Sequence, residues 1–212
     1  SILKKPTDLM IARQCIATVY LQTECFREAV EILNTIPLSE IPEKDSFIRD
    51  NTLLLLIQAK LGMKEYTSAH QNIQELSQNL KQKKELHKTS NISPYDYKDV
   101  WFKYHYFSAY YYMLNHKIPA CEEHLSRIRY AASQSPYTNY HIMLHKINGD
   151  FYALNQQYES AIKEWNAELN LLDKNFIHYQ KVLDSKASLA NRFNHYKEAY
   201  DIYLQLIHLK DS

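Results

Sequence analysis

The feature that most constrains this sequence is a spacing of small and large residues that recurs along the chain. Its clearest copy runs from Gly149 to Trp165, where two apolar helical patterns flank the polar turn 155–157. Ala161 is small, like Gly149, whereas Tyr158 is large, like Trp165. Small residues let two helices approach closely, and large ones fill the space beside the contact. The stretch therefore predicts two amphipathic helices folded back on each other.

Four further copies of this spacing follow or precede it. The small residue of each second helix is, in chain order, Ala29, Ala69, Cys121, Ala161 and Ala199. Successive members of this series recur at a nearly constant interval, except that the interval between Ala69 and Cys121 is longer. We therefore expect one array over residues 1–212, with two-helix repeats near residues 8–36, 50–80, 100–133, 142–173 and 179–209.

The composition supports an all-helical chain. Two glycines and six prolines in 212 residues are very few, whereas sheet proteins need turn residues far more often. A hydrophobic content of 45% is enough for an ordinary buried core. The apolar run 53–57 has no polar side, which is typical of a helix sandwiched between neighbours.

One long connection, residues 81–99, interrupts the regular spacing. It reads as a charged helix end followed by a loop that contains Ser, Asn and Pro. About a dozen extra residues lie here compared with the other repeats. In a stacked array such an insertion is a local bulge more often than a domain boundary, so we expect the array to continue through it.

The second half of each repeat resembles the tetratricopeptide repeat. Its pattern of an aromatic, an acid, any residue, an alanine and a further aromatic matches Tyr158, Glu159, Ser160, Ala161 and Trp165. The resemblance implies an α-solenoid, a right-handed superhelix of about five helical hairpins. It also implies a concave groove lined mainly by the first helix of each hairpin.

The resemblance places candidate ligand-binding residues in that groove. The groove positions are Gln14, Thr18, Leu54, Gln58, Lys103, Tyr106, Tyr110, Lys146, Asp150, Asp184 and Ser188. Tyr106 and Tyr110 are the expected anchors, because aromatic rings give a large contact area at low entropy cost. The lysines could meet an acidic group or a chain terminus, and the aspartates could hold backbone amides. An extended peptide or protein segment is the expected ligand, and packing within the fold is the alternative for each residue.

Other classes of function find no support. Lys and Arg number 25 against 24 acids, so a nucleic-acid surface is disfavoured, and no run of about 18 apolar residues predicts a membrane span. Phosphate loops, nucleophile elbows and zinc-protease motifs are absent, so we expect no enzyme activity and no cofactor in these residues. His141 and His145 would share a helix face, but no further ligand stands at metal spacing. No metal site is expected.

The three cysteines are Cys15, Cys25 and Cys121, an odd number without metal spacing. Each falls in a helical pattern, so buried free thiols are expected. Their redox state, and with it the compartment, stays open.

The last residues suggest a parent protein. Leu209, Lys210, Asp211 and Ser212 follow the final repeat and resemble the end of the extracytoplasmic array in bacterial membrane-bound sensor regulators. That resemblance implies the periplasmic, N-terminal part of a two-component sensor histidine kinase anchored in the inner membrane, with a homodimer through the parent chain as a further candidate. The start at Ser1 without Met also suggests part of a longer chain. The alternative is a cytoplasmic scaffold or peptide-responsive regulator that binds a protein partner.

Overall fold

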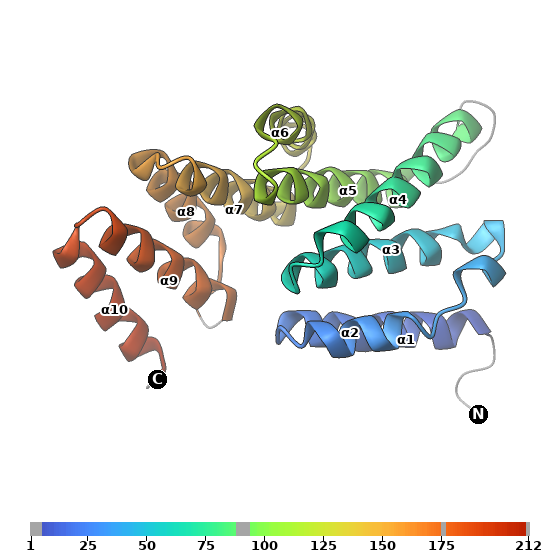
Figure 1. The fold of residues 1–212 in the computed structure, drawn as a ribbon, viewed down its shortest axis with the longest axis horizontal. Helices are drawn as coiled ribbons and strands as arrows, with labels where there is room; N and C mark the ends of the chain where they lie inside the picture. The colour runs from blue at the N-terminus through green and yellow to red at the C-terminus, as the bar shows by residue number, and fades with distance from the viewer. Residues whose placement is uncertain (1–5, 88–93, 175–176, 211–212) are drawn as a thin grey trace. The chain divides into compact units, whose positions relative to one another are not determined.

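A computed structural model describes residues 6–87, 94–174 and 177–210. These residues form α-helices and two short 3₁₀ helices, and they contain no β-strand (Figure 1). The prediction of an all-helical chain with about ten helices is confirmed for the described residues. The helices are α1 (Pro6–Gln22), α2 (Phe26–Leu33), η1 (Leu38–Glu40), η2 (Glu43–Asp45), α3 (Ser46–Gly62), α4 (Tyr66–His87), α5 (Pro94–Leu114), α6 (Ile118–Ser133), α7 (Thr138–Leu154), α8 (Tyr158–Leu171), α9 (Ile177–Arg192) and α10 (Tyr196–Lys210).

The helices pack in adjacent pairs, which we call hairpins, each with a first helix (α1, α3, α5, α7, α9) and a second helix (α2, α4, α6, α8, α10). A turn of three residues joins the two helices in every hairpin. The middle residue of each turn has a left-handed backbone, with φ between 55° and 62°. These five residues are Glu24, Lys64, His116, Gln156 and Asn194.

The same backbone hydrogen bond closes all five turns. The N–H of Cys25 donates to the carbonyl of Tyr20 at 2.8 Å, and the equivalent bond in the fourth hairpin joins Gln157 to Tyr152 at 2.9 Å. This pattern is the Schellman motif, in which a left-handed residue satisfies the last carbonyls of a helix. Glycine usually occupies that position because a Cβ atom makes it strained. None of the five residues here is glycine.

The small residue predicted early in each second helix is buried in every hairpin. Ala29, Ala69, Cys121 and Ala161 are fully buried, and Ala199 is 4% exposed. Their N–H groups donate to the carbonyl of the last turn residue at 3.0–3.1 Å. The small residue therefore lies in the first turn of each second helix and is buried there, at the position that the sequence spacing indicated.

Contacts divide the chain into two compact units, Ser1–His124 and Leu125–Ser212, with the boundary inside α6. In the first unit, α3 has apolar neighbours on two sides. Leu56 and Ala59 share a core cluster with α1 and α2, while Leu53 and Ile57 share another with α4 and α5. The prediction that the run 53–57 is sandwiched between neighbours is confirmed.

In the second unit, Trp165 of α8 fills the centre of a core cluster with Ala161 and with Leu189 of α9. Gly149 of α7 lies under its ring, and a Cβ atom added there would overlap the indole. The small residue at position 149 thus makes room for the large one at 165, in the same hairpin. A second cluster joins α9 to α10 around Leu183 and Ile202.

The connection predicted over residues 81–99 is largely helical. α4 continues to His87 and α5 begins at Pro94, so these helices reach 22 and 21 residues. Residues 88–93, where the loop was expected, lie outside the described residues. Proline tolerates the first position of a helix because its missing N–H would have no partner there. Pro94 is therefore the first residue of α5, although the sequence pattern had placed it in a loop.

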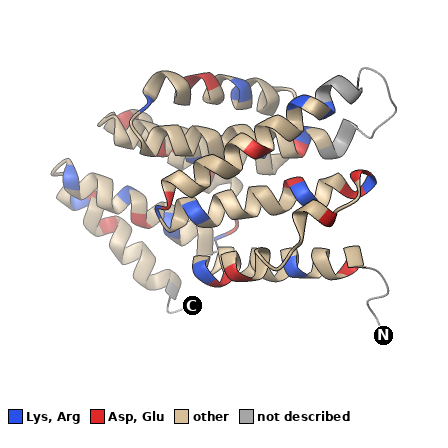
Figure 2. Ribbon diagram, turned by 45° about the vertical axis from the view of Figure 1, so that its right-hand side comes forward, with Lys and Arg blue, Asp and Glu red and all other residues tan. Residues whose placement is uncertain are grey.

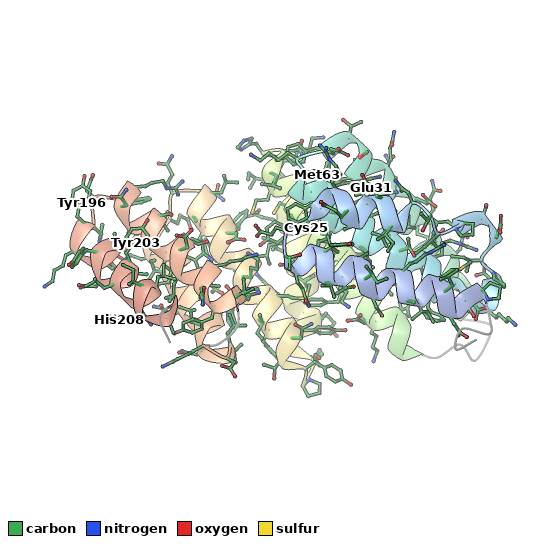
Figure 3. All side chains as sticks on the ribbon, turned by 90° about the horizontal axis from the view of Figure 1, so that it is seen from below. Cys25, Glu31, Met63, Tyr196, Tyr203 and His208 are labelled. Atoms are coloured by element: carbon green, nitrogen blue, oxygen red, sulfur yellow. The ribbon has the colours of Figure 1, made fainter. Side chains whose placement is uncertain are left out.

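The prediction of three buried thiols is right for Cys121 and wrong for Cys15. Cys121 is buried, Cys25 is half-buried in the first turn (Figure 3), and Cys15 is exposed on α1. The positions equivalent to Cys15 in α3 and α5 are Leu55 and Phe107, which pack against the core clusters beside them. No hairpin precedes α1 among the described residues, so nothing covers the thiol of Cys15.

Lys64→Gly should stabilise the protein, because Lys64 is exposed and has φ of 62°. Relief of the left-handed strain outweighs the extra freedom of glycine in the unfolded chain, so we expect a gain of about 0.5–1 kcal/mol. Urea denaturation measures it. The matched control is Gln71→Gly, at an exposed position inside α4, which should lose about 1 kcal/mol. A loss at position 64 as large as that of the control would contradict the turn geometry.

Candidate functional site

All eleven predicted groove residues lie on first helices, and each unit contains its own part of the set. Eight of them are the strongest candidates for ligand contact. The first unit contains Gln14 on α1, Gln58 on α3, and Lys103, Tyr106 and Tyr110 on α5. The second unit contains Lys146 and Asp150 on α7, and Asp184 on α9.

Within the first unit, the predicted groove positions fall into two classes. The inner positions are Gln14, Leu54 and Tyr106, and the outer positions, four residues further along each helix, are Thr18, Gln58 and Tyr110. Inner side chains are 2–6% exposed, whereas outer side chains are half-buried or exposed. Successive first helices pack against each other, α1 on α3 and α3 on α5. Gln14 bonds residues of α3, and Leu54 shares a core cluster with Tyr111 of α5. Only the outer positions present an accessible surface.

Gln14 shows what the inner positions do. Its side-chain amide donates to the carbonyl of Ile48 and to the hydroxyl of Thr52, each at 2.7 Å. Its side-chain oxygen accepts a hydrogen bond from Asn51 at 2.9 Å. The side chain therefore ties α1 to α3, and contact with a ligand would require breaking these buried bonds.

The two predicted anchors differ in accessibility. Tyr106 is 6% exposed, and its ring packs edge to face on Phe107 and Tyr110, with centroids 5.2 and 5.0 Å apart. Tyr110 is half-buried at the outer position. Edge-to-face contacts of this kind stabilise aromatic clusters. Tyr106 thus contributes mainly to packing, and Tyr110 is the ring that a ligand could reach.

Three of the four charged candidates, Lys103, Lys146 and Asp150, form ion pairs within the chain. Lys103 pairs with Asp99 at 2.7 Å, one turn earlier on α5. In the second unit, Lys146 pairs with Asp150 at 3.1 Å, and Asp184 is exposed on α9. Figure 2 shows acidic and basic residues interspersed along the helices. Exposed pairs of this kind stabilise a helix little, so a charged ligand could compete for them at low cost.

Asp150 also supports the hairpin itself. Its second carboxylate oxygen accepts a hydrogen bond from the indole N–H of Trp165 at 3.2 Å. A buried indole usually finds a polar partner for its N–H, and Asp150 provides it here. Its ligand-binding role stays a prediction, and the structure adds a role in orienting Trp165.

Sequence reasoning missed a polar crossing between the two helices of the third hairpin. The Nδ1 atoms of His105 and His124 lie 2.8 Å apart, within hydrogen-bond distance. Aromatic rings surround this pair: Trp101 and Tyr104 contact His105, while Tyr112 contacts His124. Burial raises the pKa of the Tyr112 phenol, and neighbouring phenols and an acid raise it further.

The fourth hairpin repeats this crossing with other residues. His145 stands one repeat interval after His105, and Glu164 stands one repeat interval after His124. The Nδ1 atom of His145 and a carboxylate oxygen of Glu164 are 2.8 Å apart. In the fifth hairpin the equivalent positions are the apolar pair at 183 and 202, which share one cluster. The repeat spacing was the signal that could have found these pairs, because it aligns two histidines with each other. Their position inside hairpins indicates a role in pairing the helices.

A buried carboxylate was missed as well. Asp50 of α3 is 1% exposed and forms an ion pair with Lys83 of α4. Its other oxygen accepts a hydrogen bond from Asn79 at 3.1 Å. A buried charge is tolerated only when it is paired and hydrogen-bonded. This network joins the two helices of the second hairpin near the far end of α4.

No metal centre is apparent in the described part of the chain. It contains no group of three His, Cys, Asp or Glu side chains that could hold an ion. His141 bonds the carbonyl of Ser135 at 3.1 Å and His145 bonds Glu164, so the two histidines face different partners. A shallow recess beside the start of α10, lined in part by His195 and Asp201, lies away from the predicted residues.

Comparison with known proteins does not identify a family for this chain. No family model matches the chain, and no curated protein or solved structure matches it either. Within the described residues, every helix is too short or too polar to cross a bilayer. The repeat spacing and the turns therefore carry the evidence for an array.

Lys83→Met should destabilise the protein by about 3 kcal/mol, because it leaves the charge of Asp50 buried without its partner. Thermal denaturation of the variant at neutral pH measures the loss. Lys81→Met, at an exposed position of the same helix, is the matched control and should change stability by less than about 0.5 kcal/mol. Equal effects of the two substitutions would show that the pair does not support the hairpin.

Proposed function

We propose that this chain is a tetratricopeptide-like array, a right-handed α-solenoid of five hairpins, whose first helices bind an extended peptide or protein segment. One observation supports the array above all others. The five left-handed turn residues recur at the same intervals as the buried small residues, and both series share the longer interval between the second and third hairpins. Equivalent hairpins that each pack on the next build a superhelix with one continuous binding surface.

The outer positions are the contact points in this proposal. In the first unit, Gln58 and Tyr110 are half-buried on successive first helices, and Lys103 lies on the same helix as Tyr110. An amide can pair with a peptide backbone, a phenol offers an apolar face with a polar end, and a lysine meets an acidic side chain or a carboxyl terminus. In the second unit, Lys146, Asp150 and Asp184 extend the set with charges of both signs.

The proposed biological role is that of a sensor module in a signal-transduction regulator. The resemblance of the segment 209–212 to membrane-bound sensor regulators supports the N-terminal extracytoplasmic part of a two-component sensor histidine kinase; Asp211 and Ser212 lie outside the described residues. These residues would bind the signal, and the rest of the parent would perform the chemistry. A span of about 20 apolar residues after residue 212 in the parent supports this role. Its absence would favour the cytoplasmic scaffold.

Peptide binding can be tested without knowing the natural ligand. A phage-displayed library of random dodecapeptides is selected on the wild-type chain, and the affinity of the selected peptides is measured by fluorescence polarisation. Tyr110→Ala should weaken binding by at least about tenfold, because a buried aromatic anchor typically contributes about 1–3 kcal/mol to such a contact. Gln58→Ala should weaken it less.

Tyr130→Ala is the matched control, because Tyr130 is 71% exposed on α6, a second helix. It should leave the affinity unchanged, and all variants should keep the wild-type circular dichroism. The proposal fails if no peptide is selected, or if Tyr110→Ala and Tyr130→Ala bind the selected peptides equally well.

A further inference from the structure

The first and last described helices, α1 and α10, each expose a group of apolar side chains at positions that are buried in other hairpins. On α1, Ile16 and Val19 are 46% and 57% exposed, beside the exposed Cys15. We call these three residues the head face. On α10, Tyr196, Tyr200 and Tyr203 are 63%, 61% and 41% exposed. Figure 3 labels Tyr196 and Tyr203 on this helix. We call these three residues the tail face.

In earlier hairpins, the residues equivalent to the tail face cover the first helix of the hairpin that follows. Counted from the turns, Tyr203 is equivalent to Leu33, Ile73, Leu125 and Trp165, all of which are at most 4% exposed. Leu33 shares a core cluster with Ala59 of α3, Ile73 with Tyr111 of α5, and Trp165 with Leu189 of α9. Each of these clusters joins a second helix to the first helix of the following hairpin.

Tyr196 and Tyr200 fit the same pattern. The equivalents of Tyr196 are Phe26, Tyr66, Ile118 and Tyr158, and the three aromatic ones each belong to or pack against one of these three clusters. The equivalent of Tyr200 in the second hairpin is His70, whose ring stacks on Tyr111 with centroids 4.7 Å apart. The tail face therefore presents the surface that the earlier second helices use to hold the hairpin after them.

The head-face positions form the other side of this contact between a second helix and the first helix of the following hairpin. We call this contact the joint. The equivalents of Val19 are Ala59, Tyr111, Phe151 and Leu189. Ala59, Tyr111 and Leu189 are the residues that share a cluster with the preceding second helix. The equivalent of Ile16 in α3 is Leu56, which is buried against the first hairpin. Apolar side chains at these positions are thus buried wherever a second helix lies beside them.

We propose that the tail face of one copy of this chain binds the head face of a second copy. This contact repeats, between two molecules, the joint that links successive hairpins within one molecule. The repeat register indicates why the partner is a second copy of this chain. The chain contains both halves of the joint, apolar on both sides and at positions that already pair three times inside it. The resulting interface is heterologous, because different surfaces of the two copies meet. Exposed apolar patches of this kind mark interaction surfaces.

Sedimentation velocity tests the proposal on the 212-residue chain, on Val19→Glu and on Tyr203→Glu. The wild type should self-associate as its concentration rises. Each substitution should weaken the association by at least about tenfold, because a carboxylate in an apolar joint loses its water without gaining a partner. A mixture of the two variants in equal amounts should restore a 1:1 dimer, because one variant keeps an intact tail face and the other an intact head face.

Two matched controls separate the joint from general effects of charge. Phe47→Glu changes an exposed apolar residue at the start of α3, and Tyr130→Glu changes an exposed tyrosine on α6. Both should associate as the wild type does. Circular dichroism checks that the variants fold, and Tyr200→Glu replaces Tyr203→Glu if the latter does not.

Three results would overturn the proposal. The wild type could remain monomeric at every concentration reached. Val19→Glu could associate normally while Tyr203→Glu does not, which would indicate contact between two tail faces. The mixture could stay monomeric although both variants fold, which would show that the two faces do not bind each other.

Discussion

A single backbone hydrogen bond, made after a left-handed residue at the end of each first helix, determines how the two helices of a hairpin meet. It holds the turn to three residues and leads the chain directly into the second helix. Within the first turn of that helix a small side chain reaches the crossing, where a larger one would force the helices apart. The cores, the crossing pairs and the exposed faces all take their positions from this turn.

The hairpins could be predicted from sequence because each close helix crossing requires a small residue, and these small residues recur at a regular spacing. Ala29, Ala69 and Ala161 indicated the register, and all three are buried. The turn at residues 155–157 was predicted correctly, but the left-handed residue within each turn was not, because no glycine marks that position. Residues as different as Glu24 and Lys64 adopt it, since the helices on either side compensate for the strain.

The candidate site was harder to predict than the fold. Helical spacing places Tyr106 and Tyr110 on one side of α5, but it does not show how far the neighbouring first helix extends over that side. In the structure the inner residue Tyr106 is buried, whereas the outer residue Tyr110 is half-buried. Gln14 illustrates the same limit, because its sequence position is polar and its environment is buried. Packing between repeats depends on residues that are far apart in the sequence, so the pattern of a single helix does not predict it.

The central claim is that five equivalent turns generate five equivalent hairpins. The most direct measurement is the backbone φ of the five turn residues in solution, obtained by NMR from three-bond HN–Hα couplings, one-bond Cα–Hα couplings and chemical shifts. The account predicts positive φ at Glu24, Lys64, His116, Gln156 and Asn194, near the 55–62° of the structure. A negative φ at any of the five turns would contradict it, because that hairpin could not then share the geometry of the others.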